Sequence, residues 1–504
     1  MKRLKCASLD GLDAISVDVE ATFTKGLPSF SIVGLGTGAI QESRDRIKSA
    51  LLTNDFKFPP KKITINLSPS EIAKSGSQFD LSIALLIALN EEKNVTFDDF
   101  YVFGEVGLDG KLKDTSSIFI LILSLSQAGL LKNVVIPKES VEKVSKIPNI
   151  NIYALSTLND TCDFFRFNSK EEKRVKNSDF AYNFIEINQK KYYYLSEFAL
   201  DYKDVKGQEI AKRASLIAAA GNHNILFEGS PGCGKSMITK RLRYIMPPMS
   251  LEEILEKAKL ESFDAKEPQF NPLRVYRSPH HTSTRASIFG GGTSSAKIGE
   301  VALSNNGLLF FDELPHFGKT ILEALREPLE DYTILISRVN SKVNYFTKFM
   351  FVAAQNPCPC GNLLSSKKEC RCNELEINRY KNRLSEPFLD RIDLFVTMNE
   401  NSPQDGSTVN SKQLHQKVIA AFGMQKHRMQ NDLNGKLNDE MLSKVCFLSS
   451  ECEYILNKAI ENLNLSFRSI NKIKKVARTI ADLEQSSLIE KVHLLEALSY
   501  RRRT

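Results

Sequence analysis

The chain has 504 residues, which is too long for one hydrophobic core, so we expect two to four domains. Its formal net charge of +8 permits a polyanionic partner without requiring one. Acidic residues interrupt the N-terminus before any apolar region, and the longest apolar run, at 118–123, is too short to cross a bilayer. We therefore expect neither secretion nor a membrane span, and the odd count of nine cysteines favours reduced thiols in a cytoplasm.

The first third of the chain alternates strand-like and helix-like spacing. Residues 15–22 and 62–67 favour strands, whereas 41–52 and 79–89 carry the apolar spacing of helices. This order predicts an α+β domain over residues 1–165.

A basic and aromatic stretch follows between residues 166 and 200. It contains a charge run at 169–176 and then the sequence Lys190-Lys191-Tyr192-Tyr193-Tyr194. Such composition is typical of solvated connectors, so we expect a linker here. A contact with nucleic acid is the alternative role for the same residues.

An octapeptide after residue 228 fits the phosphate-loop pattern, a glycine and four free positions before Gly-Lys-Ser. A strand-type apolar run precedes it and a helical spacing follows. The glycines turn backbone N–H groups toward phosphate, the lysine reaches the β- and γ-phosphates, and the serine hydroxyl holds magnesium. The sequence therefore predicts a site for ATP and Mg²⁺. The octapeptide consists of Gly229, Ser230, Pro231, Gly232, Cys233, Gly234, Lys235 and Ser236.

Two further apolar stretches end in polar residues that such a site needs. The run at 308–311 ends in Asp312 and Glu313. We expect Asp312 to share Mg²⁺ with Ser236, and Glu313 to orient or deprotonate the attacking water. The run at 349–354 leads to Asn356, which we expect to sense the γ-phosphate; an ordinary asparagine at a strand end is the alternative.

Four cysteines cluster directly after Asn356. Four thiolates form the closed tetrahedral set of a structural zinc site, and close cysteines in a reducing compartment favour a metal over a disulfide. A Cys-x-Cys pair is tighter than the usual zinc spacing, so unliganded thiols are the alternative. The cysteines are Cys358, Cys360, Cys370 and Cys372.

An arginine stands inside the apolar stretch 388–392. Arg391 suits a finger that is supplied in trans to the nucleotide of a neighbouring copy, with Arg383 as the second candidate. A finger in trans predicts a homo-oligomeric ring, because one copy then lacks a complete site. From residue 401 the spacing turns helical, and the apolar stripe of 466–484 predicts a helical lid over 401–504.

The phosphate loop, residues 301–315, residues 325–330 and the stretch 356–361 together resemble the AAA+ module of the ComM/YifB family, relatives of the magnesium chelatase motor and of the minichromosome-maintenance helicases. Segments at 31–35 and 104–110 are similar to that family's N-terminal domain, which itself resembles the Lon protease domain. The resemblance covers nearly the whole chain. It implies an α/β AAA+ parallel sheet at 201–400 with a helical lid, preceded by a Lon-protease-like α+β domain.

The chain departs from the Lon protease pattern where that chemistry would take place. The resemblance places Gln78 at the serine nucleophile and Phe119 at the lysine base, and neither residue can perform those roles. We therefore expect an inactive domain, although the neighbouring Ser77 leaves a protease as the alternative.

The resemblance also implies residues that contact nucleotide and substrate. Arg468 matches the family's second sensor arginine, with a solvated arginine as the alternative. By analogy with ring helicases, two insertions would face a central pore, where Lys297, Arg338 and Lys342 would contact DNA phosphates. Solvated turns are the alternative for both insertions.

These observations lead to one preferred function and two alternatives. We expect an ATP-hydrolysing ring motor that acts on DNA, in the form of a hexameric helicase or branch-migration translocase in recombination or natural transformation. A chelatase-type motor that drives metal insertion into a tetrapyrrole is the first alternative. A nucleotide-switched assembly scaffold is the second.

Overall fold

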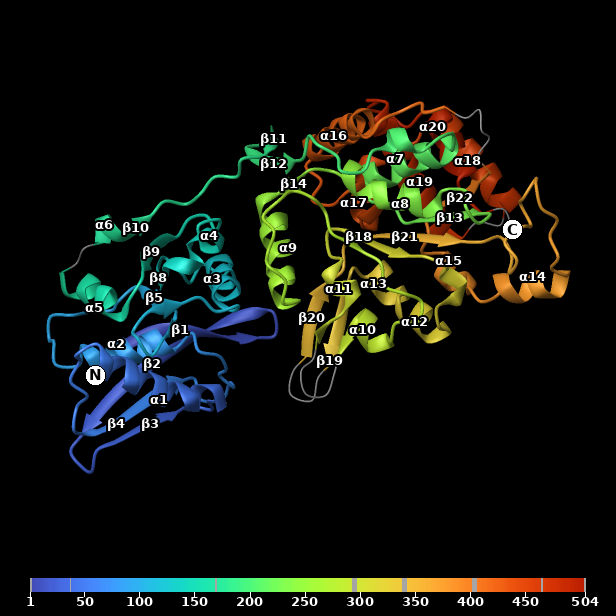
Figure 1. Ribbon diagram of the computed structural model, residues 1–504. Helices are drawn as coiled ribbons and strands as arrows, with labels where there is room; N and C mark the ends of the chain where they lie inside the picture. Colours follow the sequence, from blue (N-terminus) through green and yellow to red (C-terminus); the bar gives the residue numbers. More distant parts are fainter. Residues whose placement is uncertain are drawn as a thin grey trace. The chain divides into compact units, whose positions relative to one another are not determined.

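The computed structural model describes residues 2–36, 38–167, 170–291, 297–337, 342–400, 406–463 and 466–502 (Figure 1). The chain divides into two compact units. The first comprises Met1–Ala181 with Ala258–Phe270, and the second comprises Tyr182–Lys257 with Asn271–Thr504.

The first unit is built on an eight-stranded mixed sheet in the order β10-β9-β8-β5-β1-β2-β4-β3. Alternate residues of β2, such as Val17 and Val19, are buried, as the period-two pattern predicts. The run at 118–123 lies in α3, whose residues are buried in the core. The strands are β1 (Lys2–Asp10), β2 (Asp13–Thr24), β3 (Ser29–Val33), β4 (Lys62–Ser68), β5 (Phe100–Val102), β8 (Asn133–Pro137), β9 (Asn151–Leu155) and β10 (Arg174–Val175).

Helices cover this sheet, and a short ribbon of two strands, β6 (Glu105–Val106) and β7 (Leu112–Lys113), stands beside it. The helices are α1 (Gly38–Thr53), α2 (Asp80–Ala88), α3 (Ile118–Gln127), α4 (Val141–Val144), α5 (Leu158–Phe167) and α6 (Lys170–Lys173). Strands and helices together give the α+β unit that the sequence predicts.

The stretch expected as a linker, 166–200, differs from that expectation. Its first part belongs to the first unit, which runs to Ala181. Its second part forms a hairpin of β11 (Asn183–Ile187) and β12 (Lys190–Tyr194), which pairs with β14 (Met249–Ser250). The tyrosines pack inside the second unit, because the Tyr192 ring meets Phe422 edge-on at 5.0 Å.

The second unit is built on a five-stranded parallel sheet in the order β15-β18-β21-β13-β22. The residues of β18 and β21 are all buried, so these strands appear in the sequence as continuous apolar runs. The strands are β13 (Ile225–Gly229), β15 (Tyr276–Arg277), β18 (Leu308–Phe311), β21 (Met350–Gln355) and β22 (Leu394–Met398).

Helices flank both faces of this sheet, with α7 and α8 on the side of the C-terminal helices and α12 and α13 on the other (Figure 1). Two hairpins extend from it, β16 (Gly290–Gly291) with β17 (Lys297–Ile298) and β19 (Thr333–Ser337) with β20 (Lys342–Phe346). Helix α9 (Leu251–Phe263) begins in the second unit, and its residues from Ala258 belong to the first. The other helices are α7 (Glu209–Gly221), α8 (Lys235–Leu242), α10 (Arg285–Phe289), α11 (Glu300–Leu303), α12 (Lys319–Ala324), α13 (Arg326–Glu330), α14 (Glu374–Lys381) and α15 (Glu386–Leu389).

The C-terminal region is helical, as predicted. Its amphipathic helix α19 buries Ile473, Val476 and Ile480 in one hydrophobic cluster with the parallel sheet. Across the described ranges, no helix has the length and apolarity of a membrane span. The helices are α16 (Ser411–His427), α17 (Asp439–Val445), α18 (Ser450–Leu463), α19 (Phe467–Leu483) and α20 (Lys491–Ser499). The structure confirms the predicted α/β fold with a parallel sheet and a C-terminal helical lid.

Candidate active site

The candidate site lies at the carboxyl edge of the parallel sheet. Strand β13 leads into the phosphate loop, β18 into Asp312, and β21 into Asn356. The three strands are parallel neighbours, so the residues that follow them meet at one edge, which is where open α/β sheets bind ligands.

Glycines shape the phosphate loop. Gly232 and Gly234 have φ angles of +82° and +98°, in the left-handed region that favours glycine. A Cβ on Gly229 would lie 2.7 Å from the Met398 carbonyl oxygen and 2.8 Å from the Cys233 sulfur. Helix α8 begins directly at Lys235, so its N-terminal N–H groups point toward the loop.

Lys235 connects the loop to Asn356. Its Nζ donates to the carbonyl oxygens of Gly229 at 2.5 Å and Ser230 at 3.0 Å, and to Asn356 Oδ1 at 3.1 Å. Partial burial lowers the pKa of Lys235, while Cys233 and Asp312 oppose that shift. The residue predicted to bind phosphate and the residue predicted to sense it are thus in direct contact.

The predicted magnesium ligands also meet. The Ser236 hydroxyl donates to Asp312 Oδ2 at 3.1 Å, which places a hydroxyl and a carboxylate where Mg²⁺ between phosphates would need them.

Glu313 is held in an unusual backbone conformation. Its φ is +52°, its N–H donates to Asp312 Oδ1 at 3.0 Å, and its side chain is 53 % exposed. Non-glycine residues in the left-handed region are uncommon and cluster at functional sites. An exposed carboxylate at this position suits contact with a water molecule.

His281 is a neighbour of Glu313 that the sequence argument missed. Its Nδ1 lies 3.7 Å from Glu313 Oε2, and its ring stacks near His280 with centroids 4.2 Å apart. The adjacent histidines were visible in the sequence, but only the fold shows that one of them faces the carboxylate.

The segment before α7 closes the loop from the other side. Gln208, with φ of +59°, donates through Nε2 to the Cys233 carbonyl oxygen at 3.2 Å and to that of Asn399 at 2.6 Å. The 204–208 segment is therefore fixed against the phosphate loop, where the base of a nucleotide would lie.

Arg391 and Arg468 come together, but at the opposite edge of the sheet. Arg391 is 8 % exposed, donates to the Pro387 carbonyl oxygen and pairs with Glu330. Arg468 pairs with the other oxygen of Glu330 at 2.5 Å. Two residues after Arg391, Asp393 accepts the N–H of Asn224 at 2.8 Å, just before β13 begins. Both arginines thus lie at the amino edge of the sheet, near the start of the strand whose other end carries the phosphate loop.

Other predicted residues lie elsewhere or outside the described ranges. Arg383 donates to the Pro315 carbonyl oxygen at 3.3 Å. Lys297 and Lys342 begin β17 and β20, but their side chains are not described, and Arg338 lies outside the described residues. The insertion that carries Lys342 forms the β19–β20 hairpin, whereas the DNA contacts expected of it stay a prediction.

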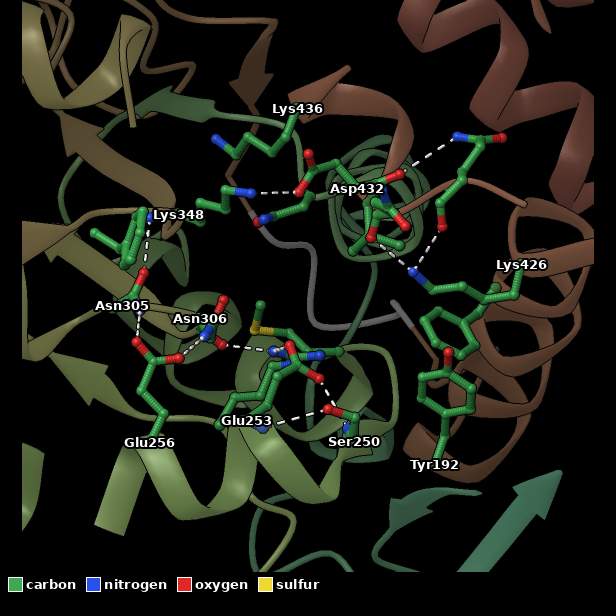
Figure 2. A pocket seen from close by; sticks show the side chains of 18 of the residues that line it. Tyr192, Ser250, Glu253, Glu256, Asn305, Asn306, Lys348, Lys426, Asp432 and Lys436 are labelled. Carbon is green, nitrogen blue, oxygen red and sulfur yellow. Dashed lines mark hydrogen bonds and ion pairs between the residues drawn. The ribbon is translucent and has the colours of Figure 1, made fainter. Parts of the chain in front are cut away.

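A cavity of about 450 Å³ lies near the amino edge of the sheet, between strand beginnings and the lid. Figure 2 shows that its polar side chains face one another: Lys348 meets Asp432 at 2.7 Å, and Glu256 accepts from Asn305 and Asn306 at 2.8 and 3.0 Å. Lys348, which follows the β19–β20 hairpin, therefore forms an ion pair with Asp432 of the lid.

The four cysteines lie together and could hold a metal. Their sulfur atoms all lie within 4.8 Å of one another. Cys358 is buried, and the backbone N–H groups of Asn362 and Arg371 lower the pKa of Cys360 to about 6.

In the first unit, Gln78 and Phe119, which the resemblance aligned with the protease serine and lysine, are both buried. Gln78 is 2 % exposed and donates through Nε2 to the Ser75 carbonyl oxygen at 2.8 Å. Phe119 is 3 % exposed and packs edge-on against Phe270 at 5.3 Å. Ser77 donates to Glu105 at 2.5 Å, so its described partner is a carboxylate rather than a lysine. Proteolytic inactivity stays a prediction.

Comparison with known proteins decides the family. Residues 201–405 match the family described as magnesium chelatase, subunit ChlI, 408–501 match its C-terminal part, and 19–140 match the family described as subunit ChlI of Mg-chelatase. Competence protein ComM of Haemophilus influenzae is 37 % identical over 505 residues, which cover 97 % of this chain and 95 % of that protein. YifB of Escherichia coli is 36 % identical over 501 residues with the same coverage.

The chain belongs to the ComM/YifB family of magnesium-chelatase-like proteins. Membership places an AAA+ module on the sheet of the second unit, in agreement with the convergence of the phosphate loop, Asp312 and Asn356.

Removal of the phosphate-binding amine should abolish nucleotide binding. We expect Lys235→Ala to lose ATP binding, because no other side chain of the loop carries a positive charge. Titration with a fluorescent ATP analogue measures this loss. Lys240→Ala is the matched control, since Lys240 is an exposed lysine of the same helix, and it should bind like the unaltered protein. Equal affinity of both variants would contradict the site.

Replacement of the Glu313 carboxylate by an amide should separate binding from turnover. We expect Glu313→Gln to bind ATP, because Lys235, Ser236 and Asp312 remain, but to hydrolyse it about 10²- to 10⁴-fold more slowly. Binding titration and a phosphate-release assay measure the two effects. Glu71→Gln, an exposed change in the first unit, should leave both unchanged. Normal turnover by Glu313→Gln would refute the assignment of Glu313 to the water.

Proposed function

We propose that this protein is an ATP-hydrolysing ring motor that acts on DNA, in the form of a hexameric helicase or branch-migration translocase. The ring is inferred from one observation: the phosphate loop lies at the carboxyl edge of the sheet, whereas the two arginines lie at its amino edge. Strand β13 is five residues long, so at about 3.3 Å per residue the edges lie about 16 Å apart. Arg391 and Arg468 therefore serve a nucleotide most simply when a second copy presents its phosphate loop to them.

Glu330 supports this assignment. It holds Arg391 and Arg468 side by side, each on its own carboxylate oxygen. Two guanidinium groups that share one carboxylate keep a net positive charge that would attract the phosphates of a nucleotide, and arginines in trans stabilise the charge of phosphoryl transfer. Residues 325–330 match the family pattern, but no spacing or periodicity in the sequence predicts a role for Glu330.

The cofactors in this proposal are ATP and Mg²⁺, which the AAA+ family implies and which the residues at the carboxyl edge fit. Bound Mg²⁺ would neutralise charge between the β- and γ-phosphates. Ser236 and Asp312 would hold the ion, Lys235 would hold the phosphates, Asn356 would position Lys235, and Glu313 would accept a proton from water. We also propose Zn²⁺ as the ion of the four cysteines, since four thiolates form a closed structural set.

DNA as the substrate rests on three supports. The chain carries a net charge of +8, two hairpins extend from the motor sheet, and a relative 37 % identical is called a competence protein. From that relative we propose a role in natural transformation or recombination, in the cytoplasm. The family descriptions that name magnesium chelatase favour, as the second candidate, a motor for metal insertion into a tetrapyrrole.

The DNA proposal predicts that DNA stimulates the ATPase. We expect forked or single-stranded DNA to raise turnover severalfold, because a translocase couples hydrolysis to its track. Phosphate release with and without DNA measures this, and heparin is the control for charge alone. A rate of ATP hydrolysis that DNA does not change would contradict the DNA motor and favour the chelatase-type function. Negligible hydrolysis under all conditions would favour an assembly scaffold.

The ring proposal predicts complementation between two inactive variants. We expect Arg391→Ala to bind ATP but lose about 10³-fold or more in turnover. When mixed with Lys235→Ala copies, which retain Arg391, about a quarter of the interfaces in a randomly mixed ring join an intact phosphate loop to an intact arginine. The mixture should therefore regain activity, whereas each variant alone stays inactive. Failure to regain activity, with mixed rings shown by cross-linking, would refute a shared site.

A further inference from the structure

The four-cysteine loop has the dimensions of a site for one metal ion. The sulfur of Cys358 lies 3.4 Å from that of Cys360 and 3.7 Å from that of Cys370, and the last two lie 3.6 Å apart. Four ligands at a Zn–S distance of about 2.3 Å in a tetrahedron lie about 3.8 Å from one another. The shortest separation far exceeds the roughly 2.05 Å of a disulfide bond. The spacing therefore fits one ion held by thiolates better than a disulfide.

The ligand type narrows the identity of the ion. Thiolates select zinc and other thiophilic metals over Mg²⁺ and Ca²⁺, which prefer oxygen. Iron–sulfur clusters also use four cysteines, but those sulfurs bind several irons and lie farther apart than ligands of a single ion. Lys367, Lys368 and Arg371 lie in the same loop.

The cysteine loop and the residues just before it contact the nucleotide site at two points. Gly361, directly after Cys360, is buried with φ of +79°, and a Cβ there would lie 2.6 Å from Cδ of Pro231 in the phosphate loop. Its N–H donates to the Cys358 carbonyl oxygen at 3.0 Å, so the turn that contains Cys358 and Cys360 ends at the residue that lies against Pro231. Two residues before Cys358, Asn356 accepts from Lys235.

We infer that zinc bound by Cys358, Cys360, Cys370 and Cys372 stabilises the conformation of the phosphate loop, so that the metal-loaded protein binds nucleotide more tightly. The inference rests on the proposed nucleotide site and zinc ion. Its physical basis is that a metal which orders a segment contributes its binding free energy to that order. The ordered turn then fixes Pro231 from one side, and Asn356 fixes Lys235 from the other.

Metal analysis of the full-length protein tests the site itself. We expect about one zinc per chain, and after exchange into Co²⁺ the visible absorption of a tetrahedral thiolate complex. Cys370→Ser and Cys372→Ser should lose the metal, whereas Cys446→Ser, a change at a buried cysteine of the lid, should retain it. Absence of zinc, or equal zinc in all three variants, would overturn the metal site.

Nucleotide titration tests whether the metal-loaded cysteine loop stabilises the phosphate loop. Removal of zinc by a chelator should raise the dissociation constant for a fluorescent ATP analogue about tenfold, and added zinc should restore it. Gly361→Ala should retain zinc yet bind nucleotide more weakly, because its methyl group would displace Pro231. If neither zinc removal nor Gly361→Ala changed the affinity for the ATP analogue, the inferred stabilisation of the phosphate loop would be refuted. If zinc-loaded protein bound no nucleotide at all, the proposed function would fail, while metal analysis would still decide the metal site.

Discussion

The structure of the second unit depends on the parallel direction of β13, β18 and β21. Parallel hydrogen bonding puts the last residue of each strand at the same edge, so three segments more than 40 residues apart meet there. The burial of these strands on both faces holds their ends in fixed positions. The sheet therefore brings together three residues that are far apart in the sequence, Lys235, Asp312 and Asn356.

The same constraint keeps other groups apart. A residue that precedes a parallel strand lies at the amino edge, so Arg391 before β22 belongs to the edge that lacks the phosphate loop. Helix α19 begins at this edge and adds Arg468, and Glu330 joins the two arginines. One copy therefore presents a phosphate-binding edge and an arginine-bearing edge, which is the arrangement that a head-to-tail ring requires.

The sequence was informative where function is local and uninformative where it depends on contacts between distant segments. The phosphate loop is contiguous, and the runs before Asp312 and Asn356 show directly that their strands are buried, so these residues were predicted from pattern alone. The role of residues 182–200 was not predicted, because a short amphipathic hairpin and a solvated connector have similar compositions. Only the pairing of β12 with β14 distinguishes the two structures. Glu330, His281 and the contact of Gly361 with Pro231 were also missed, since each depends on a partner that no periodicity or spacing specifies.

Strand β21 connects the elements that a motor would have to couple. At its amino end it follows the β19–β20 hairpin, and the adjoining Lys348 pairs with Asp432 of the lid (Figure 2). At its carboxyl end it carries Asn356 on Lys235 and then the cysteine loop on Pro231. All six of its residues are buried between neighbouring strands, so it cannot bend independently of the sheet. A displacement of Asn356 by the γ-phosphate would therefore be transmitted along a rigid strand to the hairpin and the lid, rather than dissipated in a loop. In the proposed motor, a metal-loaded cysteine loop would limit how far Asn356 can move, and the ion pair of Lys348 with Asp432 would connect that movement to the lid.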